Sequence, residues 1–154
     1  MRPENPGTTT HDPRSTQHEH AHAHEHPHRE HGDPRWAQSG FPHEKLDAYR
    51  VAREMATLAN QIAAKVARGH RNIADHLLRS ASNTVLLMAE GANRRGAALK
   101  RQRFVESRGE CGEVAAAADL LLAMQIGSSA DLQTLKSLAS RVAAMLTRLI
   151  KRLE

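Results

Sequence analysis

A short basic turn between two long helical patterns is the feature that most limits how this chain can fold. Gly91 ends the first pattern and is placed to be the residue beyond a helix end that adopts a left-handed conformation. The turn Asn93-Arg94-Arg95-Gly96 leads directly into the second pattern. Apolar residues recur at helical spacing before the turn and after it, at Ile73, Leu77, Ala81, Val85 and Met88 and at Leu99, Phe104, Val105, Val114, Ala118, Leu121 and Leu122. The sequence therefore predicts an antiparallel helical hairpin in the middle of the chain.

Two glycines within the second helix of this hairpin suggest how it packs. Gly109 and Gly112 each cost about 1 kcal/mol relative to alanine inside a helix, so a gain in packing should offset them. We expect the missing side chains to let this helix approach the preceding one closely. On this interpretation, Gly109→Leu would prevent assembly.

Two further helical patterns flank the hairpin. The first covers residues 46–66, and the last is capped by Ser128 or Ser129 and continues to Leu153. Aromatic residues make up only 3% of the chain, and the apolar residues are mainly Ala, Leu, Val and Met, which favours closely spaced helices over β-sheets. The predicted fold class is all-α, with an antiparallel up-down-up-down four-helix bundle over residues 41–154.

The first 40 residues have the composition of a disordered, His-rich N-terminal tail. They contain eight of the eleven histidines, and six Asp or Glu against four Arg. Six histidines alternate with other residues, so an extended conformer would present several imidazoles on one side: His18, His20, His22, His24, His26 and His28. Imidazoles at this density chelate nickel, zinc or copper. We expect adventitious Zn or Ni here and no cofactor; a pH-responsive tail or a neutral linker are the alternatives.

Several classes of protein are disfavoured by the sequence. The single cysteine, Cys111, cannot form an internal disulfide or a Cys-based zinc site, and we expect it to pack in the core. The N-terminus lacks the apolar stretch of a secretory signal, which predicts a cytoplasmic location. The sequence contains no run of about 18 apolar residues, so no membrane span is predicted. Because no nucleophile–base pair, phosphate loop or helix-borne metal motif is present, no enzyme activity is expected.

Positive charge is concentrated around the central turn. Residues 41–154 contain eighteen Lys or Arg against eleven Asp or Glu. Six of these cations form one cluster in the sequence: Arg94, Arg95, Lys100, Arg101, Arg103 and Arg108. Such a cluster attracts polyanions by releasing their counterions, whereas the alternative is a solvated helix face. We expect these residues to contact phosphates, without sequence-specific readout of single strands, because no aromatic stacking platform is evident.

Two acidic residues near the turn admit two interpretations. Glu90 lies in the last turn of its helix, where its charge opposes the helix dipole, so something should compensate it. We favour an ion pair with Arg79, with Arg108 or with an arginine of a neighbouring subunit. The alternative is an acid–base pair of Glu90 with Glu113.

The order of these elements resembles a known family. The chain contains Arg79-Ser80-Ala81, Ala89-Glu90-Gly91, Phe104, Arg108-Gly109 and Glu113-Val114. This pattern is similar to that of the four-helix-bundle family encoded by intervening sequences in bacterial 23S ribosomal RNA genes, and the likeness covers roughly residues 41–154. A related branch comprises the accessory variability proteins of diversity-generating retroelements. The resemblance implies a left-handed bundle, often a homo-oligomeric ring of five subunits, that associates with nucleic acid or a reverse transcriptase and has no catalytic activity.

Three positions depart from the family pattern. Leu87 stands where the family usually has Asn, Ser80 replaces an Ala, and Glu110 replaces the Ser that follows Gly109. Replacing Asn by Leu exchanges a hydrogen-bonding group for an apolar contact. Any role of that Asn is therefore not expected in this chain.

Three hypotheses about function follow. The first is a non-catalytic module that binds nucleic acid, RNA in particular, through the six clustered cations and gains affinity from repetition around an oligomer. The second is a retroelement accessory scaffold that binds a reverse transcriptase or another polymerase. The third is a metal-binding protein that uses the histidine tail.

Overall fold

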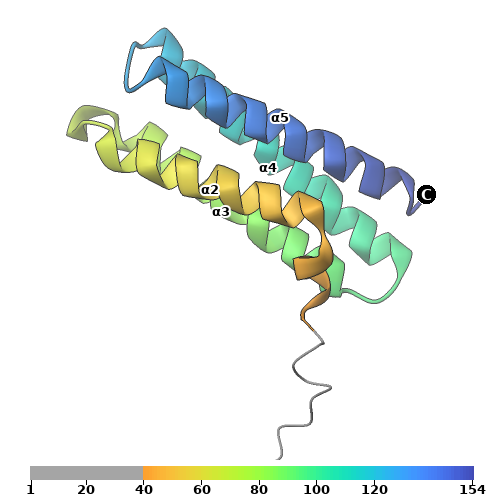
Figure 1. Ribbon diagram of the computed structural model, residues 1–154. Helices are drawn as coiled ribbons and strands as arrows, with labels where there is room; N and C mark the ends of the chain where they lie inside the picture. Colours follow the sequence, from red (N-terminus) through yellow and green to blue (C-terminus); the bar gives the residue numbers. More distant parts are fainter. Residues whose placement is uncertain (1–39) are drawn as a thin grey trace, which may run out of the picture. The chain divides into compact units, whose positions relative to one another are not determined.

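The computed structural model describes residues 40–154, which form an all-helical structure (Figure 1). No strand occurs in this part of the chain, so the predicted fold class is confirmed. The predicted tail up to residue 39, including the six alternating histidines, lies outside the described residues. The elements in chain order are η1 (Pro42–Lys45), α2 (Asp47–Lys65), η2 (Arg68–His70), α3 (Arg71–Asn93), α4 (Ala97–Ala123) and α5 (Ser129–Lys151).

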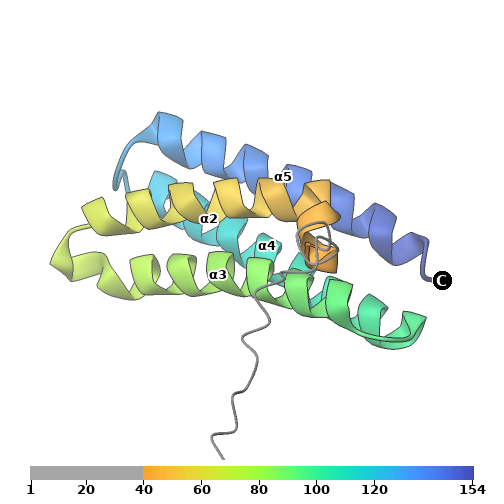
Figure 2. The same cartoon turned by 60° about the horizontal axis from the view of Figure 1, so that its bottom comes forward.

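The four long helices form a ring in which each one packs against its neighbours in the sequence. α2 contacts α3, α3 contacts α4, α4 contacts α5, and α5 closes the ring by packing on α2. Figures 1 and 2 show the four rods running side by side, with successive helices in opposite directions. The predicted up-down-up-down bundle is confirmed, and α3 and α4 share its most extensive interface.

The clearest apolar stripe in the sequence forms one wall of the core. Leu132, Leu135, Val142 and Leu146 of α5 are fully buried at helical spacing, against buried residues of the other helices. Ser128 begins this helix as its N-cap, because its Oγ accepts a hydrogen bond of 3.2 Å from the Asp131 amide. The predicted cap of the last helix is confirmed at Ser128.

Gly91 does not end a helix, so its predicted left-handed conformation is wrong. α3 continues to Asn93, and Gly91 is buried within it. A Cβ atom at this position would lie 2.8 Å from Cε1 of Phe104 and 3.1 Å from Cβ of Arg103. The missing side chain makes room for the Phe104 ring of α4, which allows the two helices to approach closely. The left-handed glycine of the turn is Gly96, with a φ of 87°.

The two glycines of α4 do not form the predicted seam. Gly109 and Gly112 are exposed, and a Cβ atom at either position would meet nothing within 4 Å. Leu99 and Val105, expected in the core, are also exposed. The helical period explains the error for Gly109, Gly112 and Val105, because the buried positions of α4 point away from them, whereas Leu99 lies in the first turn of the helix. These buried positions are Phe104, Ser107, Cys111, Val114, Ala117, Ala118 and Leu121.

Candidate nucleic-acid interface

One end of the bundle brings together parts of all four long helices. α2 begins there, α3 ends, α4 begins and α5 ends, because successive helices run in opposite directions (Figure 1). We refer to this end as the basic end and define it by residues 41–47, 93–103 and 148–154. The predicted cation cluster lies here, except for Arg108, which is farther along α4.

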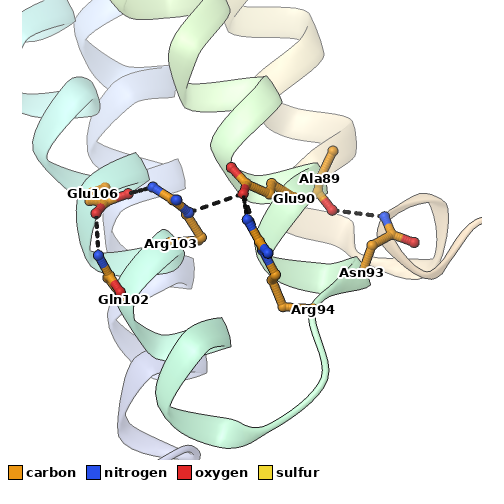
Figure 3. Close-up of polar contacts among 7 residues, drawn as sticks. All are labelled: Ala89, Glu90, Asn93, Arg94, Gln102, Arg103 and Glu106. Carbon is orange, nitrogen blue, oxygen red and sulfur yellow. Dashed lines mark hydrogen bonds and ion pairs between the residues drawn. The ribbon is translucent and has the colours of Figure 1, made fainter.

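Two of the predicted phosphate ligands belong to a chain of ion pairs (Figure 3). Glu90 Oε1 accepts a hydrogen bond of 3.1 Å from Arg94 Nε and lies 3.2 Å from Arg103 Nε. Arg103 Nη1 also donates to Glu106 Oε2 at 2.5 Å, and Gln102 donates to the other oxygen of Glu106 at 3.0 Å. These hydrogen bonds, chiefly that from Arg103, lower the pKa of Glu106. Carboxylates therefore offset the charges of Arg94 and Arg103.

The compensation expected for Glu90 is present, but with other partners than predicted. Arg94 and Arg103 bind it, whereas Arg108 Nη1 donates to Thr147 Oγ1 at 3.3 Å. Of the candidates named from sequence, neither Arg79 nor Arg108 forms an ion pair with Glu90 within residues 40–154. The positive charge comes from a residue one turn away and from the facing helix instead.

The alternative pairing of Glu90 with Glu113 is wrong. Glu113 Oε2 accepts a hydrogen bond of 2.9 Å from Ser80 Oγ and lies 3.2 Å from His76 Nε2. Ser80 and Glu90 are ten residues apart on α3, which corresponds to about 15 Å along a helix. The two carboxylates therefore stand at different levels of the bundle.

The remaining cations of the predicted cluster differ in their partners. Arg101 Nη2 lies 3.6 Å from Glu154 Oε1 at the end of the chain. Arg95 and Lys100 have no carboxylate within 4 Å among residues 40–154. Arg94, Arg101 and Arg103 have carboxylate partners. Within the described residues, Arg95 and Lys100 are therefore the cations between the turn and Arg103 whose charge is fully available to an external anion.

Four further cations at the basic end were missed in the sequence. Lys45, Arg148, Lys151 and Arg152 are exposed, and within the described part of the chain none of them has a carboxylate at ion-pair distance. Arg152 shares a surface hollow of about 310 Å³ with Lys100, so α5 and α4 present charge to the same place. The predicted topology could have identified the cations of α5, because an up-down-up-down bundle brings the last residues of the fourth helix beside the turn between the second and third.

The start of α4 carries charge that does not serve helix stability. Its N-cap, Gly96, makes no side-chain cap, and its first turn contains no acidic residue. Lys100 and Arg101 lie near this terminus, where the helix dipole disfavours cations by some tenths of a kcal/mol. The amide groups of Ala97, Ala98 and Leu99 precede the first intrahelical bond, which Lys100 makes to Gly96. Unpaired amides and cations together favour a bound anion at this terminus.

Polar residues within the signature and beside it connect α3 to α4. Besides Ser80 and Glu113, Asn83 Nδ2 donates to Glu110 Oε1 at 3.2 Å, and Ser107 Oγ donates to the Thr84 carbonyl at 2.8 Å. Each step toward the C-terminus of α3 corresponds to a step toward the N-terminus of α4, as antiparallel packing requires. These contacts hold the helix pair together. Both signature cations lie outside these contacts: Arg79 lines a surface hollow with His76 and Glu113, and Arg108 donates to Thr147 of α5.

The described residues contain few groups suited to catalysis. Burial raises the pKa of the Cys111 thiol to about 11, which keeps it protonated and unreactive. Among residues 40–154, no three His, Cys, Asp or Glu side chains are grouped as a metal site. None of the helices between these limits is long and apolar enough to cross a membrane.

Comparison with known proteins agrees with the resemblance seen in the signature. The family described as 23S rRNA-intervening sequence protein matches residues 44–148. Among curated proteins, the search returned no match. The family match covers all four long helices except the last residues of α5.

Proposed function

The chain belongs to the 23S rRNA-intervening sequence protein family, and on this premise we propose that it is a non-catalytic, nucleic-acid-binding module with RNA as its ligand. Binding takes place at the basic end. The proposal includes self-association of the chain, because several weak sites in one oligomer add their affinities.

One observation carries this proposal: cations from three separate segments meet at one end of the bundle without carboxylate partners among residues 40–154. A cation that already has an acidic partner gains little from a phosphate, since the pair must first be broken. A cation without one releases counterions when a phosphate binds. The set with full charge comprises Lys45, Arg95, Lys100, Arg148, Lys151 and Arg152.

The direction of the helices adds to this charge at one point. Lys100 follows the uncapped start of α4, whose first amides can donate to a phosphate oxygen. Arg148 and Arg152 lie in and just after the last turn of α5, where cations also stabilise the helix end. A cation at a helix end can serve phosphate binding or stabilise the helix. Lys100 distinguishes these two roles best, because it gains nothing from the helix dipole.

A salt titration tests the proposal directly. Fluorescence anisotropy with a labelled RNA should show binding at about 50 mM salt that weakens on the order of 100-fold by about 200 mM, as expected for roughly four phosphate contacts. Absence of binding at the lower salt concentration would remove the proposal. Binding that ignored salt would remove the role of the basic end.

A protein-binding scaffold is the second candidate, favoured by the outward face of α4. Val105, Leu120 and Met124 are exposed there, and Gly109 and Gly112 lie between them. An apolar helix face of this kind fits self-association or a polymerase partner such as a reverse transcriptase. Light scattering of the purified protein and of Leu120→Glu tests self-association, and co-purification tests the polymerase. A monomeric wild-type protein with no polymerase bound would remove this candidate.

Metal binding by the histidine tail stays a prediction, because its residues lie outside the described part of the chain. Calorimetry with zinc and nickel on the full chain tests it, with the six alternating histidines replaced by alanine as the control.

A further inference from the structure

An aromatic stack lies at the basic end, where none was evident in the sequence. The rings of Phe41 and His43 are stacked, with centroids 5.5 Å apart and planes inclined by 15°. His43 in turn packs against Tyr49 in an edge-to-face arrangement, with centroids 4.6 Å apart. Phe41 is 65% exposed although His43 covers one face of its ring, so the other face is open to solvent.

This stack adjoins the cations of the proposed interface. Nδ1 of His43 lies 3.0 Å from Nδ2 of Asn93, the residue that precedes Arg94 and Arg95. Pro42, which lies between the two stacked rings in the sequence, lines the same hollow as Lys100 and Arg152. An aromatic face and phosphate-binding groups are thus available to one ligand.

We propose that the basic end binds single-stranded nucleic acid, with one unpaired base stacked on Phe41 and the flanking phosphates on the neighbouring cations. This inference rests on the proposed function and names its ligand class. An unpaired base can offer its face to a side chain, whereas the bases inside a duplex are covered on both faces by their neighbours. Stacking uses the face of a base and not its edge, so strands of different sequence, RNA or DNA, gain alike from this contact. The sequence showed no aromatic stacking platform, and the stacked rings of Phe41 and His43 supply a candidate for one.

Anisotropy with two ligands tests this inference on the full chain. One ligand is an oligouridine of about 12 nucleotides and the other an RNA duplex of the same length, both at about 50 mM salt. Phe41→Ala should weaken binding of the single strand on the order of 10-fold and binding of the duplex less than about 2-fold. Phe41→Trp should retain single-strand affinity, whereas Phe41→Leu, which keeps an apolar side chain without a π-face, should behave like Phe41→Ala.

Leu86→Ala is the matched control, because Leu86 is equally exposed, at 65%, and lies on α3 away from the basic end. It should leave both affinities unchanged, and thermal melts should show that all variants fold. An oligodeoxyuridine should suffer the same loss from Phe41→Ala if stacking is the cause. Single-strand binding that is insensitive to Phe41→Ala, or an equal loss for the duplex, overturns this inference alone. Absence of binding by the wild-type protein to either ligand overturns the proposed function with it.

Discussion

The two ends of the bundle differ both in the number of their cations, nine Lys or Arg at the basic end against four at the opposite end, and in how these cations are used. At the opposite end, which we define by residues 65–75 and 119–136, Lys65 lies 3.9 Å from Asp131, Arg71 lies 3.6 Å from Asp75, and Lys136 pairs with Asp119. At the basic end, six cations have no such partner within residues 40–154. The number of Lys and Arg and the partners of each cation thus point to the same end, and the partners show in addition which of its cations an anion can use.

The starts of two helices, one at each end, differ in the same sense. α5 begins at the opposite end with a side-chain cap from Ser128 and with Asp131 in its first turn. α4 begins at the basic end with Gly96, no side-chain cap and no acidic residue in its first turn. The other two helix starts do not follow this contrast, because α2 begins at the basic end with Asp47 in its first turn, and α3 begins at the opposite end without a side-chain cap or an acidic residue there. The contrast in capping is therefore confined to α5 and α4.

The largest expected effect is on RNA affinity, when cations of the basic end are removed. Replacing Arg95, Lys100 and Arg152 together by alanine should weaken RNA binding on the order of 100-fold at low salt, because three phosphate contacts and their counterion release are lost. Anisotropy at about 50 mM salt measures it.

The matched control removes three cations from the opposite end. Alanine at Lys65, Arg68 and Arg71 changes the net charge equally and should cost less than about 3-fold. Equal losses for both triple variants would mean that net charge alone, without the basic end, drives binding.

The next effect concerns the close approach of α3 and α4 near the basic end. Gly91→Ala should destabilise the fold by about 1–3 kcal/mol, because its Cβ would collide with the Phe104 ring. Gly69→Ala, at the opposite end, meets nothing within 4 Å and should be neutral or slightly stabilising. Urea unfolding monitored by circular dichroism compares the two. A Gly91 variant as stable as the wild type would contradict the packing of Phe104 described here.

A smaller effect tests the contrast in capping. Ser128→Ala removes the hydrogen bond to the Asp131 amide and should cost about 1 kcal/mol of stability without changing RNA affinity. Chemical denaturation and anisotropy on the same preparation measure both. A change in affinity larger than about 2-fold would show that the opposite end also takes part in binding.

The smallest effect compares two neighbouring cations of α4. Lys100→Ala should reduce the slope of log affinity against log salt by about 0.7–0.9, the share of one phosphate contact. Arg101→Ala should reduce it by less, since Arg101 already lies 3.6 Å from Glu154. Salt titrations of both variants decide the order. If Arg101→Ala gave the larger change, partner carboxylates would not limit the contribution of a cation.

The helical pattern predicted the fold well, but it predicted the role of individual glycines poorly. Four apolar stripes and three short breaks were sufficient for the bundle, and Ser128 was identified as a cap from residue type and position alone. Gly91 was mistaken for a helix end because a glycine that makes room for a facing side chain has no local signature. The prediction for Gly109 and Gly112 is wrong because both point away from the buried positions of α4, and a glycine pair by itself does not show which face of a helix is packed.

The candidate interface could be predicted only in part. The cluster after the turn is visible in the sequence, whereas the contributions of Lys45, Arg148 and Arg152 depend on which helix ends meet. The pairing of Arg94 and Arg103 with Glu90 also escaped prediction, since one partner lies on the facing helix. Phe41 and His43 flank a proline in the sequence, and nothing local indicated that their rings stack.

The amino-acid sequence alone determined the class of the fold, the number of long helices and their family, because helix formation and apolar periodicity are local properties that short segments already express. The tertiary structure decided which cations keep their charge for a ligand and which are neutralised, because ion pairs form between side chains that only the packing of helices brings within a few ångströms. It also decided that Gly91, and not Gly109 or Gly112, makes room for a side chain of the facing helix, since the contact between two helices depends on both of them.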